Sequence, residues 1–397
     1  MTPTASRQPG HASSESGAMT LGEHVGGQLR RLCGAAGYPA PGRDCGGALT
    51  DLLELLGPAA PRPLAAGPPS PSFVCDDHSP VEFSLSFSAG GPPSVRVLVE
   101  PGCTAASLAD NGRQGMRALE ALAARRGFST EPVRRVEDLF LPPVIRGSFA
   151  LWCAMDLRRD GPPGIKVYVN PQAHGPDRSA DVVREALTRS GFGRAWPALR
   201  EGALSRGPGK DVVLFAALDL GRWHTPRLKV YVAHHDATAA RMRTAARLLP
   251  GGGDRDVDEF CRAVGGDPGR FARRPLVSCL SYTAHDSERP SGHTVHVPVR
   301  DHVPDDAVAR DRATAALRRH RADADAGAVD RALTAMTPRR ASEGVGLITY
   351  VSLVRSRRQP PRVTVYFSPE AYLVRPPRAA GRPPPDGAGR HRCRTAG

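Results

Sequence analysis

The 397-residue sequence lacks three features that mark common functional classes. Its eight cysteines form no CxxC motif and no cluster with histidine, so neither a zinc site nor a disulfide framework has support. It contains no charged segment followed by an apolar stretch, and no apolar run long enough to cross a membrane. We therefore expect reduced thiols and a soluble, cytoplasmic protein without membrane contact.

Aromatic residues are also scarce, at 5%, although the formal net charge of +14 suggests a nucleic-acid partner. Arginine is abundant together with alanine, glycine and proline, and the arginines are scattered along the chain rather than banded. So few aromatic side chains cannot form an extended base-stacking platform. A nucleic-acid module therefore remains a minor alternative, which would show steeply salt-dependent binding to any duplex. No nucleic-acid partner is expected.

The two ends differ in composition from the rest of the chain. Residues 1–20 and 376–397 are rich in Ser, Pro, Gly and Arg and read as a disordered leader and a loose basic tail. Residues 21–375 have enough apolar content for one large domain. We expect a single domain there, as a monomer or homodimer.

Lysine is the scarcest charged residue, and its placement reveals a repeat. Of 54 Lys plus Arg only three are Lys, and two of these, Lys166 and Lys229, begin the same tetrapeptide KVYV. The similarity extends upstream, because Asp156 and Asp219 are 63 residues apart, the same separation as Lys166 and Lys229. A slim ammonium group, rather than a planar guanidinium, is evidently suited to both positions.

Three weaker copies flank the KVYV pair: RVLV from Arg96, TVHV from Thr294 and TVYF from Thr364. The five anchors are 70, 63, 65 and 70 residues apart. Each copy consists of two apolar runs around a Gly/Pro/Asp/Arg-rich loop, which is typical of an antiparallel hairpin. Helical segments rich in Ala, Leu and Arg lie between the hairpins.

We therefore predict an α+β fold, a ten-stranded antiparallel β-barrel with a ring of outer helices, built from five ββ-α(α) repeats. Successive strand residues point to opposite faces of a sheet. The helices need an apolar surface to pack on, so the aliphatic face should point outward and the polar face should line the lumen. One acid, Glu82, lies on the polar face of the first strand.

The polar face gathers cations and ring side chains. The cations are Arg96, Lys166, Arg227, Lys229 and Arg362, and the rings are Tyr168, Tyr231, His296 and Tyr366. Converging cations suit a polyanion such as a diphosphate, and tyrosine rings attract a positive centre. A site that holds a leaving diphosphate and shields a carbocation is typical of prenyl transfer, yet no DDxxD motif is present. The lumen cations would then replace a metal, so no cofactor is expected, although Mg²⁺ can still modulate binding.

On these residues the chain resembles an aromatic prenyltransferase of the dimethylallyltryptophan synthase type, in its bacterial form, with the ABBA or PT-barrel fold. The resemblance spans residues 25–375 and is carried by VEFSLSF (81–87), RVLV (96–99), KVYVNP (166–171), RLKVYV (227–232), TVHVPVR (294–300) and TVYF (364–367). It implies dimethylallyl diphosphate, or a longer prenyl diphosphate, as donor. It implies an indole, most often L-tryptophan, as acceptor, and electrophilic aromatic substitution as the reaction.

The resemblance also implies roles for individual residues. Glu82 would accept a hydrogen bond from the indole N–H, and Lys166 would remove the proton from the attacked ring carbon. The other implied residues bind the prenyl diphosphate or shield its cation: Arg96, Lys166, Tyr168, Arg227, Lys229, Tyr231, His296, Tyr350, Arg362 and Tyr366. His296 departs from the pattern, because the family often has tyrosine there, and a protonated imidazole would repel a cation.

Several alternatives stay open at this point. Within the enzyme class, a phenolic or tyrosine acceptor is the second choice, because a phenol can also use Glu82. A barrel that binds an anionic ligand without catalysis is the other alternative, although the lysines, tyrosines and Glu82 argue against it. We expect Trp152 and Trp223 to pack rather than to bind substrate. Donor length and the attacked ring position are not determined.

Overall fold

Ten antiparallel strands form a closed barrel in the computed structural model, which describes residues 18–39, 47–159, 161–220, 227–251, 253–284 and 288–378. Each strand pairs with its neighbours in sequence, and β10 closes the barrel against β1. The strands are β1 (Val81–Ser88), β2 (Ser94–Val99), β3 (Leu151–Asp156), β4 (Gly164–Val169), β5 (Asp211–Leu220), β6 (Arg227–His234), β7 (Leu276–Thr283), β8 (Gly292–Val297), β9 (Ile348–Ser356) and β10 (Arg362–Phe367). The predicted barrel and all five hairpins are confirmed.

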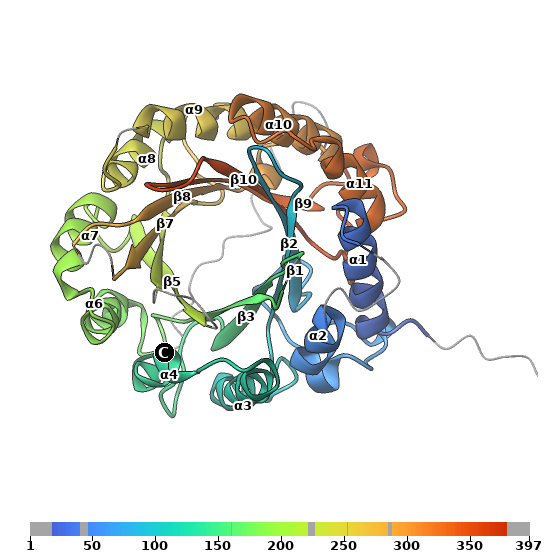
Figure 1. The fold of residues 1–397 in the computed structure, drawn as a ribbon, viewed down its shortest axis with the longest axis horizontal. Helices are drawn as coiled ribbons and strands as arrows, with labels where there is room; N and C mark the ends of the chain where they lie inside the picture. Colours follow the sequence, from blue (N-terminus) through green and yellow to red (C-terminus); the bar gives the residue numbers. More distant parts are fainter. Residues whose placement is uncertain are drawn as a thin grey trace, which may run out of the picture.

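Helices surround the barrel and follow the order of the chain around it (Figure 1). They are α1 (Leu21–Ala35), α2 (Ala48–Leu56), α3 (Leu108–Arg126), α4 (Glu131–Arg134), α5 (Glu137–Phe140), α6 (Ser179–Arg189), α7 (Trp196–Ala203), α8 (Ala239–Ala246), α9 (Asp254–Gly265), α10 (Asp306–Arg319) and α11 (Gly327–Met336). The predicted helical segments between the hairpins are confirmed.

The aliphatic face of each strand points outward, as predicted. Phe83, Val97 and Val167 are fully buried and belong to one apolar core with helix residues such as Leu119 and Val183. Burying each such side chain contributes roughly 1.5–3 kcal/mol. On β2 and β4 the alternate residues are partly exposed although helices enclose the barrel from outside, so they face an open lumen.

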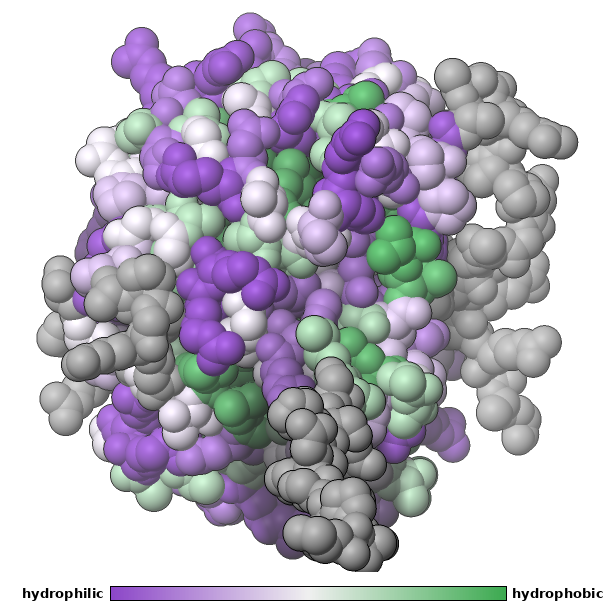
Figure 2. All heavy atoms as spheres, turned by 90° about the vertical axis from the view of Figure 1, so that its right-hand side faces the viewer, coloured by the Kyte–Doolittle hydropathy of each residue, from purple (hydrophilic) through white to green (hydrophobic). Residues whose placement is uncertain are grey.

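One side of the helix ring has a mainly polar outer surface (Figure 2). On the face next to α1, α2 and α11, hydrophilic residues dominate and apolar residues form only small separate patches (Figure 2). No helix in the described part of the chain is long and apolar enough to span a membrane. The expected leader and tail fall mostly outside the described residues; Thr20 caps α1, and Arg378 is the last residue described.

Candidate active site

The five predicted cations come together in the lumen, on strands β2, β4, β6 and β10. Burial and the neighbouring cations lower the pKa of several members of this cluster. Burial lowers the pKa of Lys166, and the guanidinium groups of Arg96 and Arg227 lower it further. Burial, together with Arg96 and Arg227, also brings the pKa of Arg362 down to about 10. The lumen therefore concentrates positive charge in a poorly hydrated space, where an anion gains the most from it.

Two carboxylates that sequence reasoning did not assign to the site lie among these cations. Asp156 Oδ2 is 3.1 Å from Arg96 Nε, and Asp219 forms an ion pair with Arg227. Although burial opposes their ionisation, the neighbouring cations lower the pKa of both acids. Both acids are therefore ionised at neutral pH. The repeat gave a signal for them, because Asp156 and Asp219 occupy the same place in two copies.

Aromatic rings from several strands form a belt around the lumen beside the cations. Tyr231 is 5.6 Å from Tyr168 and 5.9 Å from His296, and His296 is 5.6 Å from Tyr366, measured between ring centroids. The Tyr168 and Tyr231 hydroxyls are 3.4 Å apart. Lys166 Nζ lies 5.9 Å from the centre of the Tyr168 ring, which connects the belt to the cations. The predicted ring residues of the repeats are thus brought together.

His296 is a neutral member of the belt. Burial, reinforced by Lys229 and Lys166, lowers the pKa of its imidazole to about 3. Its Nε2 atom is buried and has no hydrogen-bond partner among the described residues. The imidazole therefore does not carry the positive charge that would oppose a neighbouring carbocation.

Trp152 was expected only to pack, but its position in β3 places it in the belt. Its ring stacks on Phe149 at 4.0 Å and lies 6.5 Å from Tyr168. The indole Nε1 is buried without a hydrogen-bond partner in the described part of the chain. The signal available in the sequence was strand parity, since Trp152 shares a face with Asp156. Trp223 lies outside the described residues.

Glu82 lies near one end of the barrel, at the start of β1. Thr349 Oγ1 donates a hydrogen bond to Glu82 Oε2 at 3.4 Å. Burial raises the pKa of the Glu82 carboxyl to about 8, although Arg300 partly offsets the effect. At neutral pH the free carboxyl is therefore mostly protonated, and an N–H donor placed against it would favour the ionised form.

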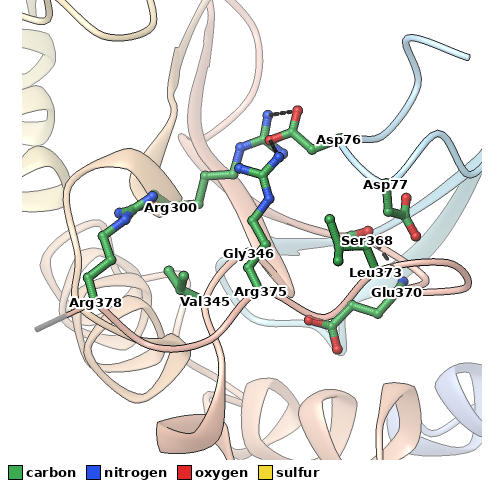
Figure 3. A pocket seen from close by; sticks show the side chains of 10 residues that line it. All are labelled: Asp76, Asp77, Arg300, Val345, Gly346, Ser368, Glu370, Leu373, Arg375 and Arg378. Atoms are coloured by element: carbon green, nitrogen blue, oxygen red, sulfur yellow. Dashed lines mark hydrogen bonds and ion pairs between the residues drawn. The ribbon is translucent and has the colours of Figure 1, made fainter. Parts of the chain in front are cut away.

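Tyr350 is the one predicted donor-binding residue that contacts a different set of cations. Its ring centre is 5.4 Å from Arg300 Cζ. Arg300 in turn donates to Asp76 at 2.9 Å (Figure 3). Arg274 also binds Asp76, at 3.0 Å. Arg375, on the chain segment after β10, approaches the same carboxylate at 3.8 Å. Asp76, Arg300 and Arg375 line a pocket toward the Glu82 end of the barrel, and sequence reasoning did not identify its arginines.

The described part of the chain holds no group of three or more His, Cys, Asp and Glu side chains that could bind a metal ion. The chemistry that the lumen itself offers is electrostatic. It combines a cation cluster, an adjoining belt of rings and a buried carboxyl with a raised pKa.

Comparisons with known proteins identify the family of the chain. Residues 23–331 match the family model for tryptophan dimethylallyltransferase. The chain is 50% identical to PriB in a complex with product diphosphate, with 91% of this chain and 99% of that chain covered and a TM-score of 0.85. PriB is also known in a ternary complex with L-tryptophan and dimethylallyl thiolodiphosphate.

Two further structures are similar over their whole length. The chain is 48% identical to the 5-dimethylallyltryptophan synthase of Streptomyces coelicolor, with 90% and 100% of the two chains covered and a TM-score of 0.84. It is 40% identical to the 6-dimethylallyltryptophan synthase of Micromonospora olivasterospora in complex with DMASPP and Trp, with 91% and 100% covered and a TM-score of 0.84. The chain therefore belongs to the tryptophan dimethylallyltransferase family of aromatic prenyltransferases.

Proposed function

We propose that this protein transfers the dimethylallyl group of dimethylallyl diphosphate to the indole ring of L-tryptophan, inside the barrel lumen. The observation that carries the proposal is the contact between a cation cluster and a ring belt, because the reaction needs a site for an anion beside a site for a carbocation. The proposal is supported by the relatives' structures, which are complexes with tryptophan and a dimethylallyl thiolodiphosphate or DMASPP.

The net charge of the lumen suits the donor. When both lysines are protonated, the five cations proposed for the donor site and the two ionised acids Asp156 and Asp219 give a net charge of +3. A prenyl diphosphate carries up to three negative charges, so the protein can neutralise it with side chains alone. We accordingly propose that the chemistry needs no metal. The same cations stabilise the charge that develops on the diphosphate as its C–O bond ionises.

The belt is proposed to shield the allylic cation. Ring quadrupoles of Tyr168, Tyr231 and Tyr366 attract a positive centre by roughly 0.5–2 kcal/mol each. Neutral His296 adds a further ring without adding charge. The belt also excludes water, which would otherwise convert the cation to an alcohol.

Glu82 is proposed to bind the indole N–H. A hydrogen bond from the N–H to the ionised carboxylate returns electron density to the ring, which then attacks the cation through carbon. A C–C bond forms as the donor's C–O bond breaks. The attacked carbon must then lose its proton to restore aromaticity.

Lys166 is proposed both as a diphosphate ligand and as the base, and these two roles need different protonation states. Lys166 can act as the base only in the fraction of enzyme molecules in which it is the neutral amine, and its lowered pKa increases that fraction. After taking the ring proton, it becomes an ammonium ion that can neutralise the departing diphosphate. A base role predicts that kcat rises with pH through the Lys166 pKa, whereas a ligand role alone predicts that kcat falls.

The test is product analysis by mass spectrometry, with L-tryptophan and dimethylallyl diphosphate as substrates and EDTA present throughout. Wild type is compared with Lys166→Ala and Glu82→Ala. Lys210→Ala serves as the matched control, because Lys210 is half exposed and pairs with Asp236 outside the lumen. The proposal predicts a product of tryptophan plus one dimethylallyl group, retained in the control and strongly reduced in both lumen variants.

Two results would overturn parts of the proposal. Release of diphosphate without a tryptophan product would keep the donor chemistry and reject the acceptor. Absence of both product and diphosphate release, with geranyl diphosphate tried as well, would reject the proposed donor.

A further inference from the structure

Asp219 lies between the two lumen lysines. Its strand, β5, is flanked by β4 and β6, and Asp219 is the direct cross-strand partner of Lys166 on β4. On β6 it forms an ion pair with Arg227, and Lys229 follows two residues later on the same face. The Asp219 side chain is only 1% exposed. One buried carboxylate is therefore within the electrostatic reach of three cations.

Each of the two lysines is surrounded by more cations than carboxylates. Lys166 faces Arg96, Arg227 and Lys229 as cations, and Asp156 and Asp219 as acids. Lys229 faces Lys166 and Arg227, with Asp219 as its carboxylate and Cys279 and neutral His296 beside it. Burial and like charge both oppose the ammonium form of the two lysines. Among these groups, Asp219 is the carboxylate that acts on both.

One oxygen of Asp219 is not used by Arg227. Oδ2 accepts from Arg227, whereas Oδ1 is buried and has no hydrogen-bond partner among the described residues. A buried carboxylate oxygen without a hydrogen-bond donor is energetically costly. The ion pair with Arg227 therefore does not by itself explain why Asp219 is buried here. A lysine ammonium group has three donors on a flexible stem and can reach such an oxygen.

We propose that Asp219 is a positioning residue that keeps the ammonium groups of Lys166 and Lys229 charged before the donor binds, and so sets the charge of the donor site. The inference rests on the proposed function, because the charge matters only if the lumen binds a diphosphate. Asp219 thus acts through the lysines and does not itself touch the reacting atoms.

The scarcity of lysine makes a direct test possible. Protein labelled with ¹³C and ¹⁵N at lysine gives three side-chain spectra, which single Lys→Arg variants assign, and each lysine is titrated by NMR. In Asp219→Asn we expect the pKa of both Lys166 and Lys229 to fall by about one unit or more. Half-exposed Lys210 serves as the internal reference and should not change.

Asp156→Asn is the matched control, because Asp156 also pairs with a lumen arginine and acts on Lys166 but is not among the main influences on Lys229. It should change the pKa of Lys229 less than that of Lys166. Asp219→Glu should restore part of the lost shift, and Asp219→Ser replaces the Asn variant if that one does not fold. Lysine pKa values that stay within about 0.3 units of wild type in the Asn or Ser variant would overturn the proposal.

A binding measurement separates the charge role from a merely structural one. Calorimetry with inorganic pyrophosphate should show an affinity that falls more steeply with rising pH in Asp219→Asn than in wild type. A loss of affinity that is equal at every pH would mean that Asp219 only holds Arg227 in place, and would overturn the charge role. If wild type binds no pyrophosphate, the proposed donor site fails, while the NMR titration still decides the role of Asp219.

Discussion

Glu82 provides a prediction in which activity and stability change in opposite directions. The pKa of its carboxyl is about 8, so in the protein without substrate Glu82 is ionised in roughly one molecule in ten at pH 7. If the carboxylate is the form that accepts the indole N–H, kcat/KM for the acceptor should rise nearly tenfold per pH unit between pH 6 and 7.5, because this parameter reports the enzyme before the acceptor binds. The slope should level off near pH 8.

Glu82→Gln should remove this slope and lower kcat/KM, because an amide oxygen is a weaker acceptor than a carboxylate. The assay is initial-rate kinetics at saturating donor. It is repeated with an indole acceptor that lacks the amino group, so that titration of the substrate amine is excluded. A wild-type profile that is flat from pH 6 to 8.5, or a Gln variant that keeps the slope, would refute the reasoning.

The same substitution should stabilise the protein at alkaline pH. A carboxyl whose pKa is raised on folding binds more protons in the folded than in the unfolded state between about pH 4.5 and pH 8. Its contribution to stability is therefore lost as pH rises through this range, by at most about 1.4 kcal/mol per unit. Glu82→Gln should thus unfold at a higher temperature than wild type at pH 8.5.

Glu100→Gln is the matched control. Glu100 is also buried, its pKa is raised to about 7, and it accepts hydrogen bonds from Ser72 and Asn111 rather than facing the proposed acceptor. The variant should alter the pH dependence of the melting temperature and leave that of kcat/KM intact. A Glu82→Gln protein that is less stable than wild type at pH 8.5 would contradict the linkage argument.

Three further predictions concern the cations, the belt and the wall of the barrel. Lys229→Met should lower kcat/KM for the donor roughly 10- to 150-fold, since it removes a charge-assisted interaction of about 1.5–3 kcal/mol, and an unchanged value would exclude Lys229 from the donor site. His296 should show no ring titration between pH 5 and 8 by NMR, because its pKa is about 3; an inflection near 6.5 would mean that the belt is hydrated. Phe83→Ala should reduce the free energy of unfolding by about 3–5 kcal/mol in denaturant titrations, because its side chain is fully buried. The control, Phe73→Ala, removes a side chain that is 44% exposed and should cost no more than about 0.5 kcal/mol; equal losses would contradict the outward-facing core.

The fold was predictable because local sequence patterns that repeat along the chain determine its strands and hairpins. Period-two alternation around each hairpin separated the two faces of the strands, and the duplicated Lys166 and Lys229 established the register between copies. The direction of each face followed from packing alone, since the helices can bury only an apolar wall. The cation cluster and the belt then followed from strand parity.

The parts that were missed depend on three-dimensional features that no repeat encodes. Asp156 and Asp219 were visible as alignment marks, but their ion pairs across neighbouring strands were not. By strand alternation Tyr350 should point into the lumen. Its position along the barrel axis instead brings its ring next to Arg300, which lies in a connection outside the repeat. The raised pKa of Glu82 requires knowledge of its burial.

The most direct test of the account is the metal dependence of the reaction. The charge balance of the lumen predicts that dimethylallyltryptophan forms in EDTA, with kcat/KM for the donor within about threefold of its value in saturating Mg²⁺, a difference below about 1 kcal/mol in transition-state stabilisation. Loss of about a hundredfold or more in EDTA, restored by Mg²⁺, would show that the side chains alone do not neutralise the diphosphate, and would contradict the account.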